Sequence, residues 1–448
     1  VERIEKGDVE LSRITKNVLV IDEAQDMNED EFSLIEALIR HNDDMRIIAV
    51  GDDDQSIYEF RHASPQYFKR LIREYGAMKY ELVENFRSKS NLVDFTNQFV
   101  TRIHHRLKEN PIIAKQADNG KIKVVRYKSE NLIEPLVKDI LSAELRGSVC
   151  VLTYTNDEAL QVSGLLLKNG MPAQLIQDNS GFCLLKLDEI NFFLSRLHSV
   201  EDIFLIDDDV WEQAKKELQT VFQNSSKLES CLGLIRDFET INPKRRYKSD
   251  LELFIRESKL NDFFGESGET IFVSTIHKVK GKEFDHVFLM LNNFNLSSDE
   301  RIRQLYVAMT RARRDLTIHL NSDFLDGLSS EDVEYMEDKI DYSPPEELAI
   351  HLTHSDIWLD YFIQRQPQIA RIRSGDTLYV REDECLDGNG QSVLKFSRNF
   401  MSEHYERLHR QGYELKRAMV NFIVYWQSEK VAKEIKIILP ELFFERKK

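Results

Sequence analysis

The sequence predicts an α/β fold built on parallel sheets, and three observations indicate it. Four consecutive aliphatic residues, Val18 to Ile21, are typical of a strand buried on both faces. Residues 29–41 follow with apolar side chains at helical spacing, and a second aliphatic strand is expected at 47–50. Both strands end in polar residues, Asp22-Glu23 and Gly51 to Gln55, at the sheet edge where α/β proteins bind ligands.

The same alternation of strands and helices returns further along the chain. A helical stretch is expected at 89–108, strands at 121–127, 149–152, 271–275 and 287–291, and helices at 131–145 and 157–169. Residues 185–262 have helical spacing without strand signals, and the acidic stretch 323–347 ends in Pro344-Pro345. The tail is β-rich, with strands expected at 377–380, 393–396, 419–426 and 434–439 around a basic helical stretch at 399–415.

These shifts predict five parts. They are the end of a first α/β domain (1–110), a second α/β domain (111–184 and 263–325), a helical insertion (185–262), an acidic connector (326–370) and a small β-rich domain (371–448). A chain of 448 residues is long enough for about three domains.

Composition excludes several classes of protein. No apolar run is longer than five residues, as in Val287 to Leu291, far shorter than the ~20 residues of a membrane helix. The four cysteines are scattered without a CxxC pair, which argues against a disulfide framework and fits a reducing cytosol. The first residues lack the apolar core of a secretory signal, and the absence of an initiator Met suggests a fragment of a longer protein.

The net charge of −16 is at first sight unsuited to binding nucleic acid. Binding depends on where the cations lie, however, and the charge is uneven. Residues 371–448 carry +3, so the first 370 residues carry −19.

The polar strand ends suggest phosphate chemistry. Asp22 and Glu23 follow a rigid strand, so one carboxylate could hold Mg²⁺ through water while the other orients or deprotonates an attacking water. The alternative is a pair of solvated acids. Gln55 is expected at the same edge, where its amide could sense a terminal phosphate, and Phe60-Arg61 could stack one base and hold one phosphate.

Six blocks carry a resemblance in a fixed order, which makes coincidence negligible. They are VLVIDEAQD (18–26), AVGDDDQSIYEFRHA (49–63), ELVENFRSKSNLVDFTN (81–97), VLTYTNDEALQVSGLLLKNGMP (151–172), IFVSTIHKVKGKEFDHVFL (271–289) and DERIRQLYVAMTRARRDL (299–316). In this order they resemble motifs II to VI of the UvrD/Rep/PcrA-type superfamily 1 DNA helicases. The resemblance covers about 300 residues and implies RecA-like, P-loop NTPase domains, with residues 185–262 as a reduced 2B-like insertion.

The resemblance implies a role for each matching residue. Asp22 would be the Mg²⁺ ligand, Glu23 the base and Gln55 the γ-phosphate contact, with Arg87 and Arg311 as arginine fingers. Phe86 stands where the family usually has Tyr, and its ring would stack on the adenine of ATP. Gly281 and Glu283 would contact the ribose. Phe60, Arg61, Thr275 and His277 would contact DNA.

Each role has a structural alternative. Arg87, beside Asn85, could tie down a loop, and Arg311 could belong to a solvated basic run. His277, Thr275 and Glu283 could be held by structural hydrogen bonds.

The chain also departs from the family pattern. No GxxxxGK[ST] phosphate loop occurs in it, so it should hold half an ATP site and not hydrolyse ATP alone. Glu59, His62 and Lys282 replace residues that are usually smaller or apolar, and this puts the local DNA contacts in doubt. The spacing from Arg87 to Thr275 is short for the family, which suggests a reduced insertion.

The tail resembles the family only loosely, through an SH3/Tudor-like domain that some members use for protein partners. Its basic helix could touch DNA, although a solvated face is the alternative, and no acidic cluster suited to a fused nuclease is present in the sequence.

The resemblance therefore implies part of a cytoplasmic, ATP- and Mg²⁺-dependent DNA helicase or translocase. It would move 3′-to-5′ on single-stranded or tailed DNA, without a membrane segment. Two alternatives remain: a non-catalytic module that binds DNA or a partner, and assembly in trans with a chain that supplies the phosphate loop.

Overall fold

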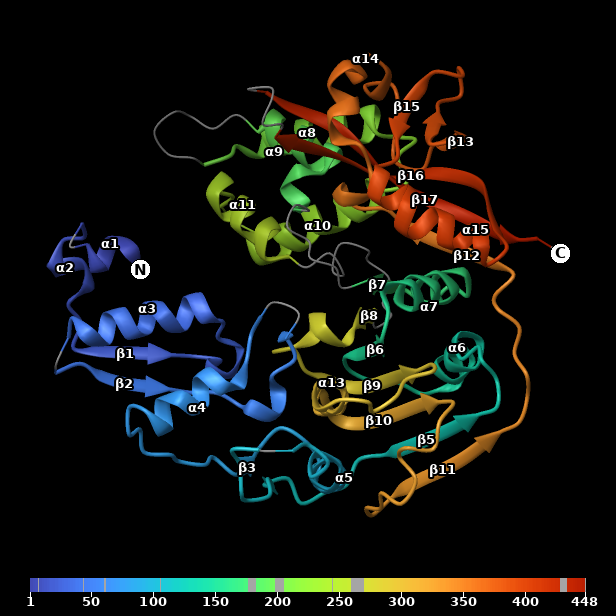
Figure 1. The fold of residues 1–448 in the computed structure, drawn as a ribbon. Coiled ribbons are helices and arrows are strands. Elements are labelled where there is room, and N and C mark those ends of the chain that lie inside the picture. Colours follow the sequence, from blue (N-terminus) through green and yellow to red (C-terminus); the bar gives the residue numbers. More distant parts are fainter. Residues whose placement is uncertain are drawn as a thin grey trace. The chain divides into compact units, whose positions relative to one another are not determined.

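The computed structural model describes ten segments of the chain (Figure 1). They are residues 1–6, 8–42, 44–59, 62–104, 106–175, 183–197, 205–243, 245–258, 270–427 and 433–447. Two compact units emerge, unit 1 (Val1–Ala159 and Phe272–Ser343) and unit 2 (Leu160–Ile271 and Pro344–Lys448). Unit 1 alternates helices with parallel strands, whereas the main sheet of unit 2 is antiparallel, so the predicted α/β class is confirmed.

Unit 1 contains the strands that carry the predicted site. They are β1 (Val18–Ile21), β2 (Arg46–Ala49), β3 (Glu84–Asn85), β4 (Ile113–Ala114), β5 (Ile122–Tyr127), β6 (Val149–Thr153), β8 (Ile271–Thr275), β9 (Phe284–Leu291), β10 (Ala312–Leu320) and β11 (Val333–Asp338). Its α-helices are α1 (Glu2–Glu5), α2 (Leu11–Ile14), α3 (Glu29–Arg40), α4 (Pro65–Arg73), α5 (Ser90–Val100), α6 (Ile133–Ser142) and α13 (Asp299–Met309), and α7 (Asn156–Lys168) runs into unit 2.

The first sheet pairs β1 with β2 in parallel. The helix α3 begins at a capping box between Asn28 and Glu31, and its apolar side chains pack with those of α4 against one face of the two strands. The prediction that β1 is buried on both faces is wrong, because Val18 and Val20 are 49% and 62% exposed. The described helices cover only one face, so alternate aliphatic residues remain in solvent.

The main sheet has seven strands, six of which lie in unit 1 in the order β11-β5-β10-β9-β6-β8. The registers of β5, β6, β9, β10 and β11 are parallel. Every residue of β6 is buried, which explains why Val149–Leu152 forms a continuous apolar run. The connection β9–α13–β10 returns to the same sheet and places Arg311 in the turn just before β10.

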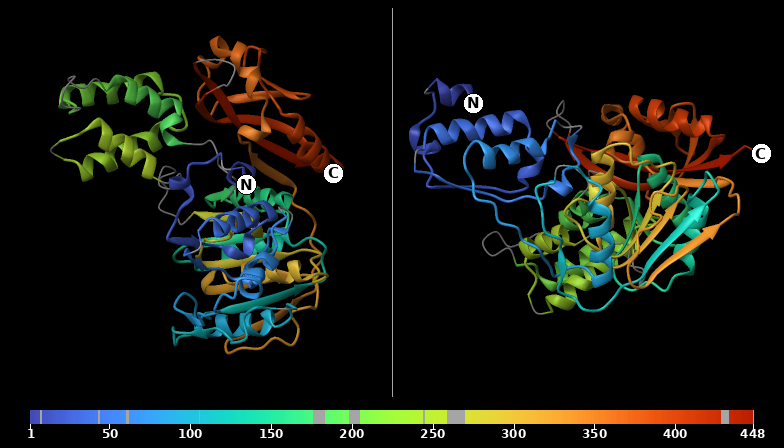
Figure 2. Two further views of the ribbon diagram at one scale, coloured as in Figure 1. Left: turned by 60° about the vertical axis from the view of Figure 1, so that its left-hand side comes forward. Right: turned by 60° about the horizontal axis from the view of Figure 1, so that its bottom comes forward.

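Unit 2 combines helices with a six-stranded antiparallel sheet in the order β12-β17-β16-β13-β14-β15. Its strands are β7 (Ala173–Leu175), β12 (Glu347–His351), β13 (Thr377–Arg381), β14 (Glu384–Leu386), β15 (Ser392–Lys395), β16 (Tyr413–Gln427) and β17 (Glu434–Arg446). Its α-helices are α8 (Asp188–Arg196), α9 (Asp208–Val221), α10 (Leu228–Ile241), α11 (Lys248–Glu257), α14 (Gln366–Ile369) and α15 (Glu406–Arg410). The long hairpin of β16 and β17 dominates the sheet (Figure 2).

One hydrophobic core joins the helices of unit 2 to its sheet, because Trp211 and Phe238 belong to the same buried cluster as Phe400 and Phe444. The strand β12 falls within the stretch expected to be a connector. The helix expected at 399–415 is shorter in the structure. A π-helical turn (Phe400–Tyr405) continues into α15, which ends at Arg410, and β16 begins at Tyr413. The boundaries drawn between insertion, connector and β-rich domain stay predictions. No helix among the described residues is long and apolar enough to cross a membrane.

Candidate active site

A buried amide joins the ends of β1 and β2. Glu23 has a left-handed backbone (φ 50°) and donates its N–H to Oδ1 of Asp22 at 2.9 Å; both carboxylates are exposed. Gln25, fully buried, donates from Nε2 to Oε2 of Glu23 at 2.6 Å and accepts from the N–H of Asp52 at 2.9 Å. A Cβ on Gly51 would lie 2.4 Å from Oε1 of Gln25, so any other residue there would displace the amide of Gln25.

Gln55 continues this connection. Its Nε2 donates to Oδ2 of Asp52 at 2.8 Å, and its Oε1 accepts from Nη2 of Arg311 at 3.1 Å. Hydrogen bonds therefore run without interruption from Glu23 through Gln25, Asp52 and Gln55 to Arg311. The structure thus brings three of the predicted residues together in one chain of contacts.

Arg311 is buried and not part of a solvated basic face, which rules out that alternative. It is 2% exposed, and its Nε and Nη1 donate to the carbonyls of Val307 and Lys282 at 2.9 and 3.2 Å. Burial lowers the pKa of Arg311 to about 10, with the charge of Arg87 acting in the same direction. The guanidinium therefore keeps its charge at neutral pH.

Arg87 and Glu283 form an ion pair, with 2.6 Å between Nη2 and Oε1. Asn85 holds the loop, because its Oδ1 accepts from the backbone N–H groups of Arg87 and Ser88, both at 2.9 Å. The side chain of Arg87 takes no part in these two hydrogen bonds. The guanidinium of Arg87 is thereby left for Glu283. Phe86, which lies between Asn85 and Arg87 in the sequence, is 68% exposed.

A cavity of about 540 Å³ lies at this place. Its lining includes Gln55, Phe86, Arg87 and Glu283, and also Asp52. A cavity of this size, lined by an aromatic ring, a cation and amide and carboxylate groups, suits a small polar ligand. Gly281, in the loop before β9, has a φ of +80°, a conformation that favours glycine.

The residues predicted to face DNA are only partly described. Thr275 ends β8 and is buried, and His277 follows in the 3₁₀ turn η5 (Ile276–Val279). The carbonyl of His277 accepts from Oη of Tyr58 at 3.3 Å, and its Nε2 lies 3.1 Å from Nε2 of Gln304. Burial lowers the pKa of His277, so the ring is neutral at pH 7. Phe60 and Arg61 lie outside the described residues.

Two family models match most of the first 323 residues. The model described as the UvrD/REP helicase N-terminal domain matches residues 10–76. The model described as the UvrD-like helicase C-terminal domain matches 80–199 and 198–323, which is more than half of the chain. The chain belongs to the UvrD-like helicase family. UvrD-like domains imply RecA-like sheets, so the predicted fold class is confirmed.

Curated relatives of this UvrD-like chain include helicases and a Gabija protein. It is 28% identical to the ATP-dependent DNA helicase Rep of Buchnera aphidicola (strain APS), over 39% of the chain and 28% of that protein. It is 24% identical to the Gabija protein GajB of Bacillus cereus VD045, over 70% of the chain and 66% of that protein. The chain thus spans between about a quarter and two thirds of the length of these relatives.

Among solved structures, the C-terminal domain of a possible DNA helicase from Lactobacillus plantarum WCFS1 aligns with the chain. The identity is 14% and the TM-score 0.29, with 56% of the chain and 98% of that domain covered. A TM-score this low supports no conclusion about the fold or the function of the UvrD-like chain.

The sequence did not predict that Lys280 belongs to the candidate site of this UvrD-like chain. This lysine is almost buried, forms an ion pair with Asp26, and has its Nζ 3.5 Å from Oε2 of Glu23 and 5.1 Å from the ring centre of Tyr58. Burial raises the pKa of Asp26, and Lys280 opposes that rise. No local signal distinguishes Lys280 from Lys278, because its partners lie some 250 positions earlier.

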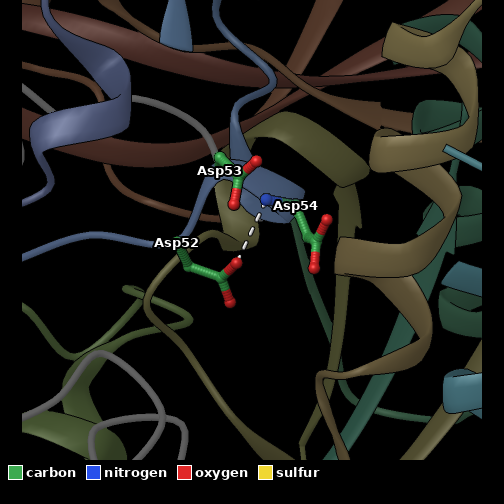
Figure 3. Close-up of side chains that lie close together, drawn as sticks. All are labelled: Asp52, Asp53 and Asp54. Carbon is green, nitrogen blue, oxygen red and sulfur yellow. Dashed lines mark hydrogen bonds between the residues drawn. The ribbon is translucent and has the colours of Figure 1, made fainter. Parts of the chain in front are cut away.

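The acidic run Asp52–Asp54 has its carboxylate oxygens close enough for a metal ion (Figure 3). The side chains have other partners, however. Arg106 binds Asp54 through Nε and Nη2 at 2.8 and 2.7 Å, and Nζ of Lys108 lies 2.6 Å from Oδ2 of Asp52. Asp53 accepts from the N–H of Leu107 at 2.7 Å. The cluster therefore anchors the segment 106–108 beside the cavity.

Proposed function

We propose that this chain contributes half of an ATP site to a UvrD-like DNA helicase or translocase. The observation that carries the proposal is the contact between Arg311 and Gln55 beside the cavity that Phe86, Arg87 and Glu283 line. Guanidinium groups, an amide and an exposed aromatic ring form the set that phosphoryl transfer and base stacking require. The relatives named ATP-dependent DNA helicases support the same class of reaction.

Each predicted residue has a proposed part. Glu23 orients and deprotonates the attacking water, Gln55 senses the terminal phosphate, and Arg87 and Arg311 stabilise charge on the transferring group. The exposed carboxylate of Asp22 offers the hard oxygen donor that Mg²⁺ prefers, so the chain fits this ion. Bound there, Mg²⁺ would neutralise phosphate charge.

The nucleoside would lie against Phe86, whose exposed ring can stack on a base. Gly281 and Glu283 would meet the ribose. Arg87 must then exchange its ion pair with Glu283 for a phosphate, which a side chain 37% exposed can do.

DNA binding is proposed for Phe60, Arg61, Thr275 and His277. Closing and opening of two RecA-like domains would move single-stranded DNA past them, in the 3′-to-5′ direction that the family resemblance implies. The β-rich tail would contact a protein partner.

A phosphate loop of the form GxxxxGK[ST] does not occur in these 448 residues. We therefore propose that this chain binds nucleotide weakly and does not hydrolyse it without a further segment or chain. The experiment is phosphate release by the 448-residue chain with MgATP, with and without single-stranded DNA, beside Glu23→Gln.

Release equal to that of Glu23→Gln would support the half-site, and DNA-stimulated release abolished by Glu23→Gln would contradict it. A fluorescent ATP analogue provides the second readout. Saturable binding that Arg87→Ala weakens supports the nucleotide site, whereas no binding by the unaltered chain would leave the non-catalytic module or assembly in trans.

A further inference from the structure

The strand β11 forms an edge of the main sheet next to β5 (Figure 1). The two strands pair in parallel from Val333 opposite Ile122 to Asp338 opposite Tyr127, and no other described strand pairs with β11. Residues 334–337 are all exposed, so neither face of the strand is fully covered. Parallel strands are usually buried on both faces, which makes β11 an exception.

The outward backbone groups of β11 can be assigned. The carbonyl of Asp338 accepts from the N–H of Lys128 at 3.1 Å, so the peptide groups of Asp338 face β5. Successive residues of a strand direct these groups to opposite sides, and those of Tyr335 and Glu337 therefore point away from the sheet. An edge of this kind can accept a further strand.

The chemistry beside this edge is acidic and partly apolar. Residues 331–341 contain six acidic side chains and one lysine. Tyr335 and Met336 are 45% and 44% exposed. Two cavities of about 470 and 280 Å³ flank the strand and share Glu337 in their linings. Arg126, which also lines both, is already paired with Asp326 and Glu337.

We propose that the outer edge of β11 binds an extended, basic segment of another protein by adding it to the sheet as a strand. Main-chain hydrogen bonds to Tyr335 and Glu337 would supply affinity, and the acidic surroundings would select lysine and arginine side chains. The acidic side chains would also repel acidic strands of other proteins. The same negative charge would therefore prevent non-specific strand pairing and select a basic partner.

The probe is a synthetic peptide of about ten residues with alternating Lys and Val, blocked at both ends and carrying a fluorophore. Anisotropy is measured with the intact chain at low and high salt. We expect saturable binding that weakens with salt and is lost for a Glu/Val peptide and for a Lys/Val peptide N-methylated at alternate residues. Equal binding of the methylated peptide, or no binding of the Lys/Val peptide, would overturn the proposal.

Two variants separate the backbone from the side chain. Glu337→Ala and Glu337→Pro both remove the carboxylate, but only proline removes the outward N–H, and an edge position tolerates proline. We expect Glu337→Pro to bind the Lys/Val peptide about fivefold more weakly than Glu337→Ala, as for one lost hydrogen bond. Equal affinities of two variants with the same circular dichroism would overturn addition at this edge.

Discussion

Arg311 donates a hydrogen bond from Nη2 to Oε1 of Gln55 at 3.1 Å, although 256 positions separate the two residues. Gln55 belongs to the turn after β2, and Arg311 immediately precedes β10, a strand of a different sheet. The contact therefore joins the β1–β2 sheet to the main sheet at the cavity where Phe86 and Glu283 also lie. Three predictions concern side chains in or beside this region, and a fourth concerns His286 on β9.

Replacing Lys280 by alanine should destabilise the protein. The change leaves the carboxylate of Asp26 without its ion pair in a site that is mostly buried, which typically costs about 3 kcal/mol. Lys282→Ala, an exposed lysine two residues further along, should change the free energy of unfolding by less than about 0.5 kcal/mol. Urea unfolding of both variants is the measurement, and equal midpoints would refute the role given to Lys280.

Replacing Asp54 by asparagine should be more costly still. Asp54 is fully buried and binds Arg106 through two hydrogen bonds, so its loss removes the carboxylate that pairs directly with this guanidinium, at about 3–5 kcal/mol. In a double-mutant cycle, Asp54→Ala with Arg106→Ala should cost less than the sum of the two single changes. Additive costs would show that the pair is not coupled. Added Mg²⁺ should not protect the cluster, because its side chains already have partners.

Phe86→Ala should weaken binding of a fluorescent ATP analogue by about tenfold while Phe86→Tyr leaves it unchanged, since stacking needs only the ring. The stability should hardly change, because the side chain is 68% exposed. Tyr80→Ala is the matched control, as Tyr80 is 79% exposed and does not line the cavity. An equal effect of both alanine variants on binding would count against a nucleoside at Phe86.

His286→Gln should destabilise the protein more at pH 5.5 than at pH 8.5. The hydrogen bond from Nδ1 to Asp315 at 2.9 Å raises the pKa of His286, and Nε2 also has an acceptor, the carbonyl of Arg146 at 2.9 Å. A raised folded-state pKa stabilises the protein fully below the unfolded value of ~6.5, and this stabilisation is lost as the pH rises through the folded value. Urea unfolding at the two pH values measures it, and a pH-independent cost would contradict the ion pair.

The sequence patterns located the elements well where a buried strand left a strong signal. The strands at 18–21 and 271–275 were predicted with the bounds that β1 and β8 have, and the helix at 29–41 differs from α3 by one residue. Aliphatic runs bounded by polar residues carry this information locally. The exposure of Val18 and Val20 could not be predicted, because it depends on which layers cover the sheet and not on the strand itself.

The candidate site was predictable where ordered motifs marked it, as for Glu23, Gln55 and Arg311, whose contacts the structure now describes. Their proposed roles in catalysis stay predictions. Gln25 and Lys280 were not predicted because an amide and a lysine are common on surfaces, and only the folded chain shows that Gln25 is buried and Lys280 almost buried beside Glu23. Long-range partners of this kind leave no periodic trace in a sequence.

The hydrogen bonds from Glu23 through Gln25, Asp52 and Gln55 to Arg311 have a consequence for energetics. Substitutions at the two ends, which share no contact in this chain, would ordinarily have additive effects on stability. Here each link fixes the donor or acceptor of the next, so weakening one end changes what the other end contributes. We therefore expect the effects of substitutions at Glu23 and Arg311 on stability to depart from additivity, and this departure to shrink when the uncharged amide of Gln25, which links them, is removed.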